Sequence, residues 1–198
     1  MSRKMIVGMM AGAVTSAVMT SGIGVGRADT VVGVAVGLLP GGNAKVKAGG
    51  ESASAPMETG VALGARIGYD ASSVIRVAGE LLFLPSLRGD NGNDDEPGLR
   101  LFSPGARLDA HRALSATAHL YAYGRFGYSR VTSADDDGVG SGVLIGGGLG
   151  GRFALSSDLD GFVEAGYLWS THEVDVDGPN PRIDFDYFLL SAGVALDL

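Results

Sequence analysis

The chain has 198 residues, enough for one domain, and a formal net charge of −7. This acidity disfavours nucleic-acid binding, and the 33 glycines follow no Gly-x-y period, which excludes a collagen-like rod. The chain contains no cysteine, so disulfides and lipid attachment at a lipoprotein cysteine are excluded as well.

The N-terminal segment has the features of a secretory signal peptide. A positively charged start is followed by an uncharged stretch over residues 6–26 and by small residues around Ala28. This pattern predicts cleavage after Ala28, in preference to a retained transmembrane helix. The predicted organisation is therefore a signal peptide, 1–28, followed by a single domain, 29–198.

Eight segments of alternating apolar residues follow, each about as long as a membrane-crossing strand, which needs roughly 9–11 residues. They cover residues 31–39, 58–69, 74–84, 99–109, 116–130, 141–154, 161–171 and 184–198. The last segment alternates from Phe188 to Leu198, and a strand in this position needs a partner on each side. Closure into a barrel provides both partners. The sequence therefore predicts an all-β fold, an eight-stranded antiparallel up-and-down transmembrane β-barrel.

The connections between the predicted strands alternate in length. The long ones follow odd-numbered strands, at 40–57, 85–98, 131–140 and 172–183, and the short ones follow even-numbered strands, at 70–73, 110–115 and 155–160. This alternation is typical of bacterial outer-membrane barrels. We therefore expect the long loops outside the cell, and the short turns and both termini in the periplasm. The first loop, 40–56, is small and predicted to be flexible, and Pro104 inside the fourth strand predicts a β-bulge.

The two faces of the predicted strands differ in chemistry. One face is apolar, and the other carries isolated charges among Gly, Ala and Ser. These charges are Arg66, Arg76, Glu80, Arg107, Arg125, Arg152 and Glu164. A water-facing surface would carry many Lys, Glu and Asp, whereas an eight-stranded lumen is narrow enough to be filled by side chains. We therefore predict that Leu149 faces lipid and Leu144 the lumen.

Buried charges are expected to pair, because an unpaired buried charge is costly. The seven lumen charges are thus predicted to form an ion-paired cluster that plugs the barrel, with a narrow ion path as the alternative. Five Arg against two Glu leave excess positive charge, which Asp109 and water would offset. Glycines at positions 142, 146, 148 and 150 are expected to make room for Arg side chains from neighbouring strands.

Strand count, loop lengths, the Arg/Glu lumen and the terminal strand together resemble the small OmpA/OmpX-type, opacity-protein-like outer-membrane barrels over residues 29–198. Unlike many of these barrels, the chain ends in Leu198 and not in Phe. The resemblance implies an outer-membrane location and a structural, envelope-stabilising or surface-interaction role, with no cofactor and no enzymatic activity. It also implies outer-membrane lipid, lipopolysaccharide and the barrel-assembly machinery, through the C-terminal strand, as partners.

Two alternative functions remain open. Glu164, Ser170 and His172 share one face of the seventh strand, which loosely resembles the outer-membrane lipid A deacylases. A serine nucleophile needs a base and a third, orienting group, but Glu164 lies about 20 Å or more from His172 along the strand. We therefore assign no catalytic residue. The second alternative is a soluble periplasmic barrel that binds an apolar ligand, with its apolar face inward.

Two acidic segments, 90–96 and 135–137, contain enough carboxylates to attract Ca²⁺ or Mg²⁺. Their spacing does not match that of an EF-hand, because the Gly and the closing Glu are misplaced. Solvated surface loops explain these segments better. We therefore assign no metal site and no cofactor.

Overall fold

A computed structural model describes residues 30–88, 98–133, 140–174 and 181–198. The predicted signal peptide, 1–28, lies outside these residues, and so do the acidic segments 90–96 and 135–137. Among the described residues, no helix has the length and apolar character needed to cross a membrane.

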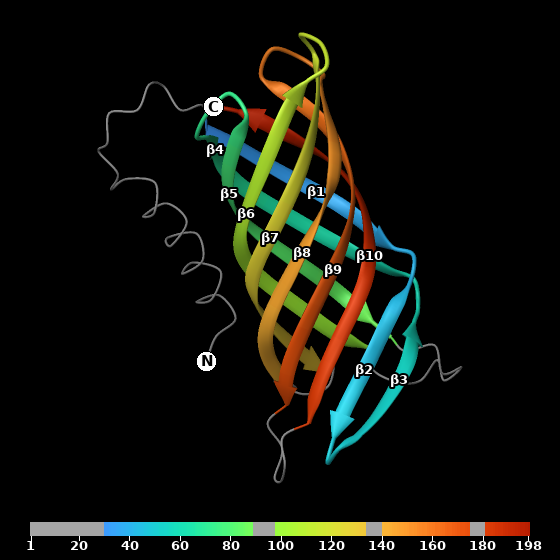
Figure 1. The fold of residues 1–198 in the computed structure, drawn as a ribbon. Coiled ribbons are helices and arrows are strands. Elements are labelled where there is room, and N and C mark those ends of the chain that lie inside the picture. The colour runs from blue at the N-terminus through green and yellow to red at the C-terminus, as the bar shows by residue number, and fades with distance from the viewer. Residues whose placement is uncertain (1–29, 89–97, 134–139, 175–180) are drawn as a thin grey trace, which may run out of the picture.

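Ten strands form one antiparallel sheet. Their bounds are β1 Thr30–Leu39, β2 Gly42–Ala48, β3 Glu51–Met57, β4 Gly60–Asp70, β5 Ile75–Leu87, β6 Leu99–Ala113, β7 Ala118–Ser133, β8 Gly140–Ala154, β9 Leu159–Val174 and β10 Arg182–Asp197. Eight of them close into a barrel in the order β1-β4-β5-β6-β7-β8-β9-β10, because β10 pairs back with β1 (Figure 1). The predicted eight-stranded antiparallel barrel is confirmed, with strand bounds within a few residues of those expected.

The connections sort to the two ends of the barrel as their lengths predict. The short turns after β4, β6 and β8 lie at the same end as Thr30 and the end of β10, and the strand ends that border the longer connections lie at the opposite end (Figure 1). The backbone amide of Leu198 donates to the carbonyl oxygen of Thr30 at 2.8 Å. The first and last strands are thus joined up to the rim at the short-turn end.

The expectation of a flexible first loop over 40–56 is wrong, because this segment forms the β2–β3 hairpin. Gly49 and Gly50 turn the chain with φ angles of 58° and 90°, which glycine adopts without steric cost. β2 then pairs with residues 182–187 of β10, beyond the point where β1 ends. The alternation of β2 followed by Gly-Gly is a hairpin signal that the composition of the loop obscured.

The alternation of side chains places the apolar face outside. Leu149 is 68% exposed on the outer surface, whereas Leu144 is 2% exposed inside the barrel. Large apolar side chains are exposed on every barrel strand from β4 to β10. This orientation is the opposite of that in a soluble barrel with an apolar interior and a polar surface.

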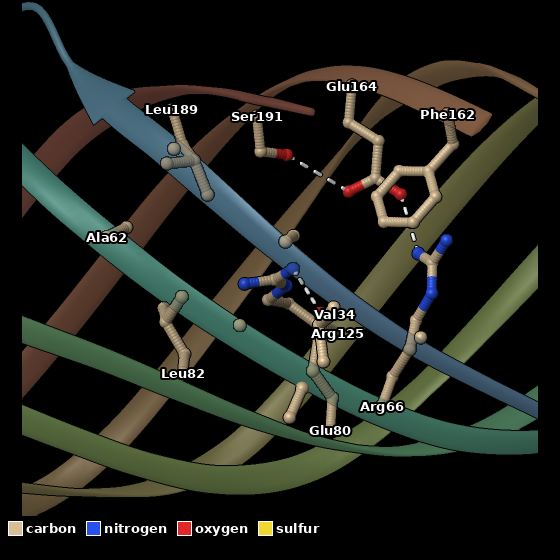
Figure 2. A pocket seen from close by; sticks show the side chains of 15 residues that line it. Val34, Ala62, Arg66, Glu80, Leu82, Arg125, Phe162, Glu164, Leu189 and Ser191 are labelled. Atoms are coloured by element: carbon tan, nitrogen blue, oxygen red, sulfur yellow. Dashed lines mark hydrogen bonds and ion pairs between the residues drawn. The ribbon is translucent and has the colours of Figure 1, made fainter. Parts of the chain in front are cut away.

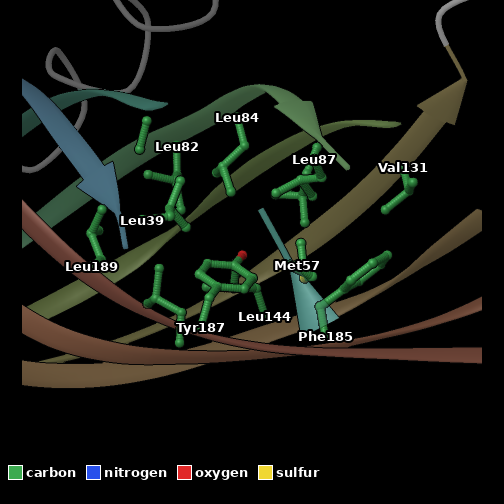
Figure 3. Close-up of a cluster of buried hydrophobic side chains, with 13 residues drawn as sticks. Leu39, Met57, Leu82, Leu84, Leu87, Val131, Leu144, Phe185, Tyr187 and Leu189 are labelled. Atoms are coloured by element: carbon green, nitrogen blue, oxygen red, sulfur yellow. The ribbon is translucent and has the colours of Figure 1, made fainter. Parts of the chain in front are cut away.

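The lumen is polar along only part of its length. Toward the long-loop end it holds a packed apolar cluster from β1, β3 to β10 (Figure 3). Its buried members are Leu39, Met57, Ala62, Leu82, Leu84, Leu87, Leu101, Val131, Leu144, Leu168, Phe185, Tyr187 and Leu189. The inward-facing position predicted for Leu144 is therefore confirmed, and this residue lies in a hydrophobic environment that the sequence analysis did not describe.

The predicted β-bulge at Pro104 is also wrong, because β6 and β7 keep the same register on both sides of this residue. Pro104 has no amide hydrogen to donate to the opposite residue, Tyr128. The hydroxyl of the preceding residue, Ser103, donates to the carbonyl oxygen of Tyr128 at 2.7 Å instead. The one register shift between β5 and β6 lies elsewhere, between Leu84 and Leu87.

Whether the Ser103 hydroxyl replaces the backbone amide that Pro104 lacks can be tested with a rescue experiment. Ser103→Ala should lower the free energy of unfolding by about 1–3 kcal/mol, because the Tyr128 carbonyl oxygen loses its donor. Adding Pro104→Ala supplies a backbone amide, so the double variant should recover most of the loss. Urea unfolding in lipid vesicles measures both effects. A double variant that is no more stable than Ser103→Ala would contradict the assignment.

Candidate functional site

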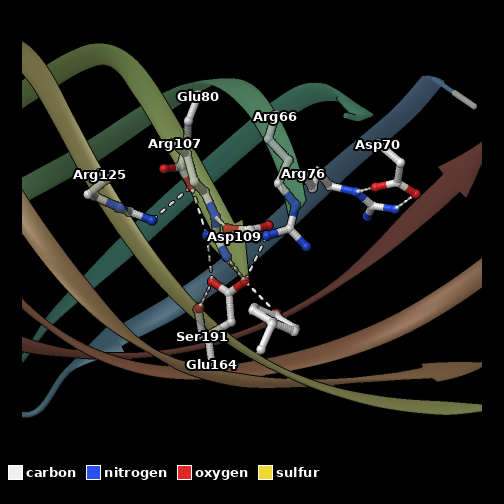
Figure 4. Close-up of polar contacts among 10 residues, drawn as sticks. Arg66, Asp70, Arg76, Glu80, Arg107, Asp109, Arg125, Glu164 and Ser191 are labelled. Carbon is white, nitrogen blue, oxygen red and sulfur yellow. Dashed lines mark hydrogen bonds and ion pairs between the residues drawn. The ribbon is translucent and has the colours of Figure 1, made fainter. Parts of the chain in front are cut away.

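The charged side chains meet inside the barrel because the two-residue period of each strand directs them there. Arg66, Glu80, Arg107, Arg125 and Glu164 come from β4, β5, β6, β7 and β9 and form the lumen cluster (Figure 4). Four further side chains complete it, Asp109, Tyr121, Tyr123 and Ser191. Arg107, Asp109, Arg125 and Glu164 are buried, and Arg66, Glu80 and Ser191 are partly buried.

Glu164 is the centre of the lumen cluster. Its carboxylate accepts hydrogen bonds from Arg66 Nη1 at 2.7 Å and from Arg107 Nη2 and Nη1 at 2.8 and 3.1 Å. The Tyr121 hydroxyl donates to it at 2.7 Å and the Ser191 hydroxyl at 3.3 Å. Both carboxylate oxygens are thus satisfied by charged and neutral donors, as a buried carboxylate requires.

Arg107 is shared among three carboxylates. In addition to Glu164, its Nε lies 2.6 Å from Asp109 and its Nη1 lies 3.5 Å from Glu80. Glu80 also accepts a hydrogen bond from Arg125 Nη2 at 2.8 Å. Three arginines therefore face three carboxylates, so the cluster is formally neutral.

Aromatic rings fill the space around the guanidinium groups. The Arg107 guanidinium lies 4.0 Å from the centroid of the Tyr123 ring, and that of Arg66 lies 3.9 Å from the Phe162 ring. These distances are typical of cation–π contacts. These rings were not predicted as part of the lumen cluster, although Tyr121 and Tyr123 lie on the same face of β7 as Arg125.

The lumen glycines of β8 make room for different side chains than expected. Gly148 and Gly150 lie against the rings of Tyr123 and Tyr121 and not against arginines. A Cβ at Gly146 would meet Leu168 Cδ2 and then Arg125 Cγ, and one at Gly142 would meet the backbone of Thr171 and His172. Two of the four glycines thus leave room for tyrosines of the neighbouring strand β7, and one leaves room for an arginine.

The two remaining predicted charges, Arg76 and Arg152, pair with acids that the sequence analysis had not assigned to the lumen. Arg76 binds Asp70 through Nε at 2.6 Å and Nη2 at 2.9 Å. Arg152 Nε lies 3.1 Å from Asp160. The predicted excess of positive charge is therefore wrong, since each arginine has a nearby carboxylate. Asp70 and Asp160 share the lumen parity of their strands, a signal that could have identified them.

A small cavity of about 20 Å³ lies beside the lumen cluster (Figure 2). On one side it is lined by small residues of β1 and β4, such as Gly33, Ala35 and Gly64, and on the other by Glu80 and Arg125. A cavity of this size holds about one water molecule. It offers room for hydration of the cluster.

His172 forms a contact that the sequence analysis did not predict. Its Nε2 lies 2.9 Å from the Ser129 hydroxyl, across Gly142, which has no side chain to separate them. Glu164 belongs to the lumen cluster, and Ser170 is fully buried. His172 and Ser129 are also buried inside the barrel, where a lipid substrate has no access to them.

The described residues contain no group of three or more His, Cys, Asp or Glu side chains that could hold a metal ion. The acidic segments considered as cation sites, 90–96 and 135–137, lie outside these residues.

No protein-family model matches the chain, and no curated protein matches it in sequence. Solved structures with a similar fold include Neisserial surface protein A, with a TM-score of 0.54 and 20% identity over 85% of this chain and 97% of that one. The outer membrane protein OprG from Pseudomonas aeruginosa has a TM-score of 0.57 and 14% identity, over 86% and 96% of the two chains.

A third similar structure is the outer membrane protein AlkL, determined by solid-state NMR in DMPC lipid bilayers. Its TM-score is 0.52, with 20% identity over 90% of this chain and 94% of that one. These similarities show that the chain has the fold of small outer-membrane barrels, the fold that the sequence resemblance implied.

The central position of Glu164 predicts a ranking of two variants. Glu164→Ala should lower the free energy of unfolding by roughly 3–5 kcal/mol, because it leaves two buried arginines without their main partner. Glu80→Ala should cost less, since Glu80 has fewer partners and is more exposed. Urea unfolding in lipid vesicles would establish the order, and a larger loss for Glu80→Ala would contradict it.

The packing of Tyr121 against β8 predicts a contrast between two neighbouring glycines. Gly150→Ala would push a methyl group into the Tyr121 ring and should cost about 1–3 kcal/mol. Gly151→Ala is the matched control, because its methyl group would meet only Leu120 Cδ2, at 3.9 Å on the outer surface. Equal stability of the two variants in the same unfolding assay would show that Tyr121 is not held as described.

Proposed function

We propose that the protein is an integral barrel of the bacterial outer membrane with a structural, envelope-stabilising or surface-interaction role. The observation that carries the proposal is the apolar outer surface. Around the level of the lumen cluster, the outward-facing side chains are apolar on every strand, and the charged ones point inward. Hydrocarbon chains are the environment in which such a surface is stable. The alternative of a soluble periplasmic barrel needs the reverse arrangement.

We further propose that the barrel does not conduct ions. Two packed layers support this, the lumen cluster and the apolar cluster on its long-loop side. The cavity of about 20 Å³ beside Arg125 is too small to connect the two ends. A filled lumen favours a role for the barrel as a rigid anchor over a role in transport.

The proposed orientation places the long connections outside the cell and the short turns in the periplasm. The β2–β3 hairpin would then project from the cell surface. Outer-membrane lipid and lipopolysaccharide would contact the apolar wall, and the barrel-assembly machinery would recognise β10. The similar proteins OprG and AlkL, which are named as outer membrane proteins, support the location.

We also propose that the protein has no enzymatic activity. The hydroxyl and imidazole that approach each other, those of Ser129 and His172, are both buried in the lumen. A labelled-lipid assay addresses the alternative of a lipid-modifying enzyme. Hydrolysis by the wild type that is lost in His172→Ala would overturn this part of the proposal.

Cell fractionation and planar-bilayer recording test the proposed function together. The protein should remain in the outer-membrane fraction after a carbonate wash, because its outer surface is apolar. Inserted into a planar bilayer, it should give no steady single-channel steps, because the lumen is filled. Recovery in the soluble periplasm would contradict the location, and selective single-channel steps would contradict the closed lumen.

A further inference from the structure

The outer surface and the interior exchange their chemistry along the barrel axis. Around the lumen cluster, charges lie inside and apolar groups outside. On β6, Arg107 is 2% exposed in the lumen while the next residue, Leu108, is 52% exposed on the outer surface. On β9, the buried Glu164 follows the exposed Val163 in the same way.

At the long-loop end of the same strands the arrangement is reversed. On β6 and β7, Leu101 and Val131 are buried inside, and their neighbours Arg100 and Arg130 are exposed outside. On β9, Val174 is buried beside the exposed Glu173. On β10, Phe185 is buried between two carboxylates of the outer face, Asp186, which is partly exposed, and Asp184, which Lys47 covers. Four strands therefore change from an apolar to a charged outer surface at one end.

A reversal of this kind indicates that the surroundings of the barrel change from lipid to water. Lipid stabilises apolar groups on the outside of a barrel, whereas water stabilises charged groups outside and apolar groups inside. We propose that the bilayer ends between these two levels, and that the long-loop end of the barrel stands in water as an extension whose interior is filled by the outermost part of the apolar cluster. This inference rests on the proposed membrane location and specifies which residues contact lipid.

Aromatic side chains mark the proposed boundary. Tyr128 precedes Arg130 on the outer face of β7, and Trp169 is the last large apolar side chain before Glu173 on β9. Rings at these positions match the aromatic girdle of membrane barrels. They also place the boundary at comparable positions on two strands.

The length of the apolar wall fits this boundary. From Gly161 to Trp169 the chain covers about 27 Å along β9, or roughly 20 Å along the membrane normal at a typical tilt. Leu155 and Phe153 pack over Gly161 and continue the apolar surface into the short turn. The total is close to the ~25 Å apolar band of outer-membrane barrels.

The β2–β3 hairpin completes the extension. Its Met57 joins the apolar cluster inside, together with Leu87 of β5 and Phe185 of β10 (Figure 3). On the outer side, Lys47 Nζ lies 2.7 Å from Asp184, whose carboxylate also accepts a hydrogen bond from Arg182. Where the hairpin joins the barrel, Met57 and Ala44 thus pack on the apolar cluster and Lys47 pairs with a carboxylate on the outer side.

Because the chain contains no cysteine, single cysteines can report the boundary. We would compare Glu173→Cys with Tyr167→Cys on β9, and Arg130→Cys with Phe126→Cys on β7, all four on the outer face. The full barrel is reconstituted in phosphatidylcholine vesicles and treated with a charged maleimide. Glu173→Cys and Arg130→Cys should react at least about tenfold faster, because a thiol in lipid does not ionise readily.

The outcomes separate this inference from the proposed membrane location. Slow reaction of all four cysteines would place the boundary farther out and overturn the inference, while the membrane location would stand. Fast reaction of all four would overturn the membrane location as well.

Trp169, the single tryptophan, gives a second test in the unmodified chain. In vesicles of brominated phosphatidylcholine, bromines near the headgroup should quench the fluorescence of Trp169 more than bromines deep in the acyl chain. The opposite order would overturn the proposed boundary.

Discussion

The narrowness of an eight-stranded lumen is the constraint on which the rest of this structure depends. Every second residue of each strand points into a space that side chains must fill. This chain fills that space in two ways, with a neutral network of arginines and carboxylates in one part and with packed apolar groups in the other. The network is centred on Glu164, and its donors come from β4, β6, β7 and β10. Strands that are not neighbours in the sheet are thereby joined through the interior.

The strands and their faces could be predicted because both follow from a two-residue period. The network could be predicted only in part. The alternation assigned Arg76 and Arg152 to the lumen. Their partners Asp70 and Asp160 follow the same alternation but lie one residue outside the predicted strands 58–69 and 161–171. Which of several carboxylates pairs with Arg107 depends on the shear of the barrel, that is, on the stagger between its strands. A single sequence does not specify this stagger.

Other features depend on contacts that local patterns do not contain. The β2–β3 hairpin is held by β10, more than 130 residues away, as the bond from Lys47 to Asp184 shows. The apolar part of the lumen includes Leu144 and Leu168, which face inward on neighbouring strands directly beside Arg125 of the lumen cluster. Pro104 avoids a bulge because the hydroxyl of Ser103 takes over a backbone bond. In each case a tertiary contact decided what the local pattern left open.

The position of β10 has a consequence for the order of folding. This strand pairs with β9, with β1 and with β2, so it joins the end of the chain to two segments near its start. Pairings of such long sequence separation carry a high loop-closure entropy and form slowly. The pairing of β2 with β3 is local, so its loop-closure entropy is low. β1 and β2 follow each other in the chain and form the edge with which β10 pairs to close the sheet.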